Sequence, residues 1–245
     1  MSVQKGAGLP DWLLAAVPLL FIYAPVALCH LRRVDSWSYR LSIPAFSDRA
    51  AWSEALCLNA RTLALIIPPW LLGYHLYQTR LFGHHLGDGW RHGLAPALLA
   101  VGQPPPRYLQ ELAQALTGSH AQEIAVLAGV QVFTLVAFQI FFVAVPEEFF
   151  YRGYFLTRLN EVLPRRFLVL GTPMGWGAVI ACTYFAFGHS VVQWQWWHFA
   201  TFFPGMIFAW MRERTGGIAA GALFHAACNI MVVLLDSCYG VPRAM

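Results

Sequence analysis

The chain has 245 residues, of which 16 are Lys or Arg and 12 are Asp or Glu, giving a formal net charge of +4. Charged residues make up 11% of the sequence and hydrophobic residues 58%, whereas soluble domains carry about 25% charged residues. This composition, with a mean hydropathy of +0.52, excludes an ordinary water-soluble enzyme. It also indicates no nucleic-acid partner, because no run of Lys and Arg residues forms a basic patch.

Six apolar stretches follow one another along the chain, and each is a candidate membrane-spanning helix because about 20 apolar residues cross a bilayer. They cover residues 12–31, 62–77, 124–146, 167–187, 196–211 and 218–235. We therefore predict an all-α fold, a polytopic transmembrane helix bundle of about six and up to eight spans with interfacial helices. A shorter apolar run, residues 94–101, predicts an interfacial or re-entrant segment.

The sequence predicts two parts within one integral membrane domain. Residues 1–123 hold N-terminal spans and a connection on the membrane surface, and residues 124–245 hold a helix bundle that carries the polar motifs described below. Basic residues in the flanks after the first, third and fifth spans outnumber those on the other side by eight to five. This excess predicts that the flanks after the first, third and fifth spans face the cytoplasm and that both termini lie outside.

Two adjacent carboxylates, Glu147 and Glu148, end the third apolar stretch, and Arg152 follows them. Ionisable groups at membrane depth cost about 2.5–3.5 kcal/mol each on insertion scales, so each needs a partner or a role. On a helix, Glu148 and Arg152 lie one turn apart and can pair, whereas Glu147 points about 100° away. A solvated helix that begins after Pro146 is the alternative, but the apolar character of residues 149–156 favours a membrane-embedded helix.

Two further polar motifs lie in later apolar stretches. Phe185 and His189 are one helical turn apart near the end of the fourth stretch, and His225 and Asn229 are one turn apart within the sixth. His189 alone is typical of an interfacial residue, and the His225 and Asn229 pair could serve only to join helices. Counted along straight helices, Glu147 and His189 differ in depth by about 10–15 Å, which tilt or a helix break would have to close.

The three motifs together predict a peptide hydrolase. A carboxylate such as Glu147 can act as general base on a water that it shares with His189, with Glu148 and Arg152 positioning the group. His225 and Asn229 would donate hydrogen bonds to the oxyanion that forms during attack on a peptide carbonyl. Glu147, His189 and His225 could instead hold Zn²⁺, but the sequence has no HExxH motif, and we favour a reaction without a cofactor.

These motifs resemble those of a known family. Glu147-Glu148-x-x-x-Arg152, Phe185-x-x-x-His189 and His225-x-x-x-Asn229, each in an apolar helix, are similar to the CAAX protease and bacteriocin-processing (CPBP, or Abi) family of intramembrane proteases. The resemblance covers residues 145–229 and implies an endopeptidase of glutamate type. It implies that the first Glu is the base, the first His shares its water, and the second His and the Asn form the oxyanion hole.

The resemblance also implies the substrate class and the location. The partners would be the lipid bilayer and a protein or peptide cleaved near its C-terminal or membrane-proximal segment, in a bacterial inner membrane. Removal of C-terminal sorting helices, in a sortase-like or myxosortase-like way, is one version of this activity. The alternatives are a non-enzymatic membrane protein that binds peptides and a proton-coupled transporter that uses the same polar pocket.

A second group of histidines lies outside these motifs. His75, His84, His85 and His92 could form a metal or pH-sensing patch. Because they flank the long connection after the second span, we favour interfacial side chains.

Overall fold

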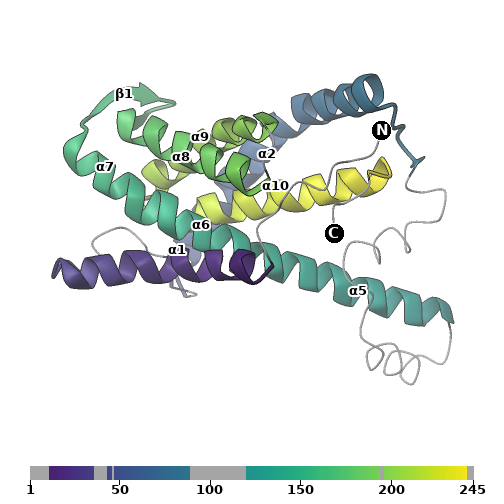
Figure 1. Cartoon of the computed structure of the whole chain (residues 1–245), viewed down its shortest axis with the longest axis horizontal. Coiled ribbons are helices and arrows are strands. Elements are labelled where there is room, and N and C mark those ends of the chain that lie inside the picture. Colours follow the sequence, from purple (N-terminus) through teal and green to yellow (C-terminus); the bar gives the residue numbers. More distant parts are fainter. Residues whose placement is uncertain (1–10, 36–42, 46, 89–119, 194–195, 242–245) are drawn as a thin grey trace. The chain divides into compact units, whose positions relative to one another are not determined.

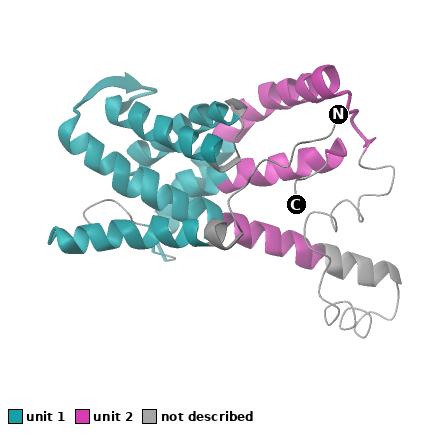
Figure 2. Ribbon diagram, viewed as in Figure 1, with its two compact units in different colours: residues 1–61, 141–225 teal, residues 62–140, 226–245 magenta. Residues whose placement is uncertain are grey.

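The computed structural model describes residues 11–35, 43–45, 47–88, 120–193 and 196–241 (Figure 1). These residues are almost entirely helical, which confirms the predicted all-α membrane bundle. They fall into two compact units, Met1–Arg61 with Phe141–His225 and Thr62–Ile140 with Ala226–Met245 (Figure 2). The predicted run at residues 94–101 lies outside the described residues.

Three described helical segments are long and apolar enough to cross a bilayer, namely Arg49–Phe82, Gly129–Val162 and Ala219–Cys238. The first joins α2 (Arg49–Tyr77) to a π-helix, Gln78–Phe82. The last is α10 (Ala219–Cys238). A shorter apolar segment, Ala16–Leu31, lies in α1 (Asp11–Leu31).

The Gly129–Val162 segment is an uninterrupted helical run of changing pitch. In chain order it comprises α5 (His120–Phe138), the π-helix Gln139–Ala144, α6 (Val145–Glu148), the π-helix Phe149–Phe155 and α7 (Leu156–Val162). The expectation that the helix continues through the acidic pair is confirmed, because the run ends only at Val162.

The fourth apolar stretch is not one helix, contrary to the prediction. Its first part belongs to an antiparallel hairpin of β1 (Arg165–Val169) and β2 (Thr172–Gly175), and α8 (Trp176–Gln193) begins only afterwards. The reversal occurs at Leu170 and Gly171, whose φ angles are 48° and 77°. Two successive residues with positive φ form the tight turn of a two-residue hairpin, which interrupts the helix that the apolar pattern predicted.

The fifth stretch also begins differently from the prediction. A 3-10 helix, Trp196–Thr201, precedes α9 (Phe202–Thr215). The core of the first unit lies between α7, β2, α8 and α9, where six buried residues pack together: Leu156, Met174, Ala178, Ala181, Cys182 and Ala209. Three of the six are alanines, and such small residues let helix backbones approach closely.

We expect the substitution Gly175→Ala to destabilise the first unit by about 1–3 kcal/mol, since overpacking costs this much. A Cβ at Gly175 would lie 2.8 Å from the Pro164 carbonyl oxygen and 3.0 Å from Arg165 Cα. Both are backbone atoms, which cannot rotate away. Thermal unfolding in detergent measures the loss. Gly73→Ala is the control, because a Cβ there meets nothing within 4 Å, and equal losses from both changes would contradict the packing described here.

In the second unit, hydrogen bonds join the end of α2 to the end of α10. The Tyr74 hydroxyl donates to Asp236 and accepts from Gln78 Nε2. His75 Nδ1 lies 2.7 Å from the Tyr239 hydroxyl, and His84 Nδ1 lies 3.2 Å from Gln78 Oε1. His75 therefore contacts a residue that follows α10, whereas His84 contacts Gln78 of the preceding π-helix. His92 lies outside the described residues.

Candidate active site

The acidic pair lies on α6, which has only four residues and is flanked on both sides by π-helices. A π-helix turn contains about one residue more than an α-helix turn and often occurs at functional sites. Pro146 lies inside this continuous helical run, where a proline has no N–H to donate to the preceding turn. Glu147 and Glu148 therefore lie where the helix pitch changes.

Glu148 and Arg152 form the ion pair that their spacing predicts, and both side chains are fully buried. Arg152 Nη1 lies 2.9 Å from Glu148 Oε1, and Arg152 Nη2 donates to the Gly205 carbonyl at 3.1 Å. The guanidinium carbon lies 4.2 Å from the centre of the Phe185 ring. A buried charge pair requires such further partners to offset its desolvation.

Two glycines make room for this pair, and the motif analysis did not single them out. A Cβ at Gly205 would lie 3.0 Å from Arg152 Nη2, and a Cβ at Gly221 would lie 3.0 Å from Glu148 Oε2. Glycine allows close backbone approach. The available sequence signal was weak, since a glycine in an apolar helix is also typical of ordinary helix contacts.

His225 contacts the same pair from α10. Its Nδ1 lies 3.2 Å from Glu148 Oε1 and its Nε2 lies 3.8 Å from Glu147 Oε2. An ionised carboxylate paired with Arg152 only accepts hydrogen bonds, so Nδ1 of His225 is the donor. The His225 ring stacks on Phe208, with ring centres 4.8 Å apart and an interplanar angle of 16°.

His189 approaches Glu147 from α8. Its Nδ1 lies 3.0 Å from the Phe185 carbonyl oxygen and its Nε2 lies 3.9 Å from Glu147 Oε2. A carbonyl oxygen only accepts, so Nδ1 carries the proton and Nε2 presents a lone pair. The Phe185 ring centre lies 4.4 Å from that of His189, the contact expected of side chains one helical turn apart.

The expected depth mismatch between Glu147 and His189 does not exist. Thirteen residues separate Glu147 from Asn160, and 13 separate Trp176 from His189, so each lies about 20 Å along its helix from the hairpin end. The sequence count was too large because it treated the hairpin residues as helix. A hairpin reverses the chain without adding helical length, and the two side chains therefore lie at one level.

Oε2 of Glu147 is buried and has no hydrogen-bond partner among the described residues. The distances of 3.8 and 3.9 Å to the two Nε2 atoms are too long for direct hydrogen bonds. Distances of this length leave room for a water molecule that hydrogen-bonds to the carboxylate and to an imidazole. The arrangement can thus hold a small polar reactant between a carboxylate and two imidazoles.

Asn229 belongs to the second unit and is one helical turn beyond His225 on α10. Its Nδ2 donates to Gln139 Oε1 at 3.0 Å. Gln139 begins the π-helix that precedes α6 and was not among the predicted site residues. The signal that could have identified it is a carboxamide within an otherwise apolar stretch, which requires a polar partner.

The zinc alternative involves three of these side chains. Glu147, His189 and His225 provide the atom types that zinc accepts. Among the described residues, however, no three His, Cys, Asp or Glu side chains are arranged to hold a metal ion. The absence of a metal therefore stays a prediction, and the reaction proposed below uses the side chains themselves.

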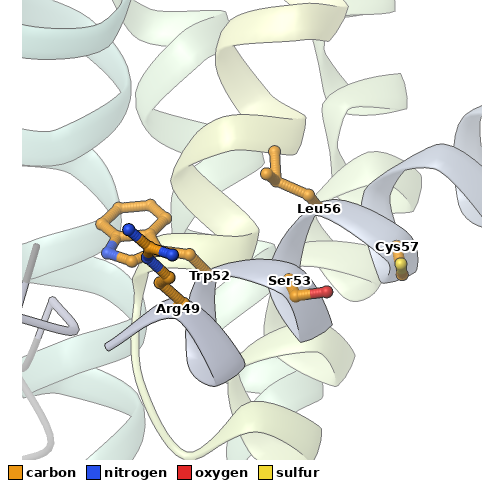
Figure 3. Close-up of a pocket in the computed structure, with 5 residues that line it drawn as sticks. All are labelled: Arg49, Trp52, Ser53, Leu56 and Cys57. Atoms are coloured by element: carbon orange, nitrogen blue, oxygen red, sulfur yellow. The ribbon is translucent and has the colours of Figure 1, made fainter. Parts of the chain in front are cut away.

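A separate hollow of about 590 Å³ lies along the first turns of α2 (Figure 3). Arg49, Trp52, Ser53, Leu56 and Cys57 line it. None of them belongs to the predicted motifs, so the acidic and histidine cluster lies elsewhere.

The comparisons with known proteins point to the same segment. Residues 129–231 match the family model of the type II CAAX prenyl endopeptidases, Rce1-like. The match includes all six predicted site residues: Glu147, Glu148, Arg152, His189, His225 and Asn229. No curated protein and no solved structure matches the chain. The resemblance noted in the motifs is confirmed over residues 129–231 of this integral membrane protein, which are similar to the CAAX protease (CPBP) family of peptidases.

Proposed function

We propose that the chain is an intramembrane endopeptidase in which Glu147 activates a water molecule for attack on a peptide bond. The observation that supports this role most strongly is the buried, unpartnered Glu147 Oε2 between two imidazole Nε2 atoms at 3.8 and 3.9 Å. A water at this point can donate one proton to Glu147 and the other to His189, which leaves an oxygen lone pair for attack.

The reaction then proceeds through a tetrahedral intermediate. The water oxygen bonds to the peptide carbonyl carbon, and its proton passes to Glu147. The carbonyl oxygen becomes an oxyanion, which His225 and Asn229 stabilise by donating hydrogen bonds. His225 must carry a second proton, on Nε2, for this role, because its Nδ1 donates to Glu148. Glu147 finally passes its proton to the leaving amine, and the carbon–nitrogen bond breaks.

The proposed role of Glu148 and Arg152 is to position these groups. Glu148 holds the His225 ring through Nδ1, at 3.2 Å. Arg152 balances the charge of Glu148 and is itself held by the Gly205 carbonyl. Neither side chain is exposed, so neither is required to contact the substrate.

The substrate class that we propose is a protein with a membrane-proximal segment, such as the C-terminal anchoring helix of an exported bacterial protein. Glu147 is 18 residues from Gly129 and 15 from Val162, the ends of its apolar helical segment. It therefore lies about 27 and 22 Å along the helix from these ends, near the middle of this apolar segment. A peptide bond must reach this depth to be cleaved.

The direct experiment places the purified chain in lipid nanodiscs with membrane-anchored test proteins, each carrying a C-terminal hydrophobic helix. Mass spectrometry of the products should show a new chain end near that helix. Intact test proteins throughout, together with proton uptake across a vesicle membrane, would instead indicate a transporter. Bound but intact test proteins would indicate a binding protein.

We also propose that the reaction needs no metal. Incubation with EDTA or 1,10-phenanthroline should leave the cleavage rate within about twofold of the untreated rate, because Glu147 acts as the base without a Lewis acid. Elemental analysis of the active protein is the companion measurement. A loss of activity on chelation that added Zn²⁺ reverses would refute the metal-free reaction.

A further inference from the structure

The hairpin of β1 and β2 lies between α7 and α8 (Figure 1), and it exposes apolar side chains on both of its faces. All five residues of β1 are exposed. Leu168 and Leu170 at its end are 73% and 76% exposed, and Phe167 and Val169 are 38% and 36% exposed. Because successive strand residues point to opposite faces, both faces of this strand expose apolar side chains.

The turn itself retains an apolar residue at an unfavourable position. Leu170 has a φ of 48°, a conformation that Gly, Asn and Asp adopt more readily. Gly171 follows with a φ of 77° and fits the turn without strain. A polar residue at position 170 would form the same turn more easily and would be better solvated, so the leucine indicates an apolar medium around the tip.

Two side chains of α9 hold the hairpin near its turn, and one of them is an arginine beside the apolar residues. Trp210 Nε1 donates to the Val169 carbonyl at 3.0 Å, and Arg214 Nη1 donates to the Leu170 carbonyl at 3.3 Å. The guanidinium carbon of Arg214 lies 5.5 Å from the Trp210 ring centre. Arg and Trp side chains are both suited to the headgroup layer of a membrane.

The position of the hairpin in the chain places it at one end of a long apolar helix. It begins three residues after Val162, the end of the apolar helical segment Gly129–Val162. Within the described part of the chain, β1 pairs with β2 alone, which leaves backbone groups on its other edge. Such groups cannot enter the hydrocarbon core without hydrogen-bond partners, but the headgroup layer supplies water to them.

We propose that the tip of the hairpin, residues 167–170, inserts into the headgroup and upper acyl layer of the bilayer, with Arg166 and Arg214 at the level of anionic lipid phosphates. Exposed apolar side chains on both faces favour lipid, which surrounds the tip, over a protein strand, which would cover one edge or face. Both arginines are exposed and can reach phosphate oxygens. This inference concerns the membrane contact and does not depend on the proposed peptidase mechanism.

The test replaces Leu168, and separately Leu170, with an environment-sensitive fluorescent amino acid in the full chain. The protein is reconstituted into nanodiscs of phosphatidylcholine with brominated acyl chains, which quench nearby fluorophores. Glu161 is the matched control position, since it is 44% exposed at the same end of α7 but polar. We expect quenching at positions 168 and 170 to be at least threefold stronger than at 161.

Equal quenching at all three positions would overturn the insertion of the tip. A second comparison tests the contact between the arginines and anionic lipid. Replacing brominated phosphatidylcholine by brominated phosphatidylglycerol should increase quenching at position 168. The substitution Arg166→Gln should reduce that increase at least twofold. An unchanged response to phosphatidylglycerol would refute the role of the arginines.

Discussion

Arg152→Met is expected to lower the free energy of unfolding by about 3–5 kcal/mol, the loss typical of breaking a buried ion pair from one side. The change leaves the Glu148 carboxylate fully buried without its cation and removes the donor to the Gly205 carbonyl. Thermal unfolding of the purified protein in detergent, with ligand-free samples at one pH, measures the loss. The variant should also lose proteolytic activity, because His225 is held through Glu148.

A matched surface pair provides the control. Arg158 and Glu161 also pair along the same helix, but their side chains are 34% and 44% exposed. Arg158→Met should therefore cost at most about 1 kcal/mol. The double substitution Glu148→Gln with Arg152→Met should recover part of the stability, since it removes the isolated charge. Similar losses of stability from Arg152→Met and Arg158→Met would show that burial of the pair does not determine the size of the loss.

Glu147→Gln is expected to reduce the cleavage rate by about 10²–10⁴-fold, the usual contribution of a general base. The carboxamide keeps the size of the side chain but cannot accept the proton of the attacking water. Substrate affinity should change little, because the Oε2 atom faces two imidazoles. Binding and single-turnover cleavage, measured on one nanodisc preparation, separate these two effects.

Glu161→Gln is the control for this substitution, because it makes the same chemical change on the same helical run at an exposed position. It should leave the rate unchanged. His189→Ala should also slow cleavage, since it removes the second group that contacts the water. Cleavage by Glu147→Gln at the normal rate would exclude Glu147 as the base.

Local features of the site could be predicted from the sequence, because they depend on helix spacing alone. The pairing of Glu148 with Arg152 follows from four residues of separation, and the contact of Phe185 with His189 follows from the same spacing. The continuation of the helix beyond Glu147 could be predicted from the aromatic residues that follow it. The composition alone indicated the membrane class.

The remaining features depend on contacts between distant segments. The hairpin could not be predicted because a short apolar run fits a strand and a buried helix equally well, and this error produced the apparent depth mismatch of His189. The stacking of Phe208 on His225 and the close approach of Gly221 to Glu148 depend on how helices pack. Nothing in the spacing of one segment identifies these neighbours.

The polar contacts of Asn229 show the same limit. The sequence indicated that a carboxamide within an apolar helix needs a partner, but it did not identify Gln139, which is 90 residues away. Such pairs become visible only when the helices are placed side by side.

The most direct measurement of the central claim is single-turnover cleavage in water enriched in ¹⁸O, with enzyme in excess over substrate. If Glu147 activates water, the new C-terminal carboxylate of the product carries ¹⁸O at the enrichment of the solvent after the first turnover, and the Glu147 carboxylate carries none. If Glu147 instead attacks the peptide carbonyl itself, the first-turnover product retains ¹⁶O and the label enters the Glu147 side chain, which would contradict the mechanism.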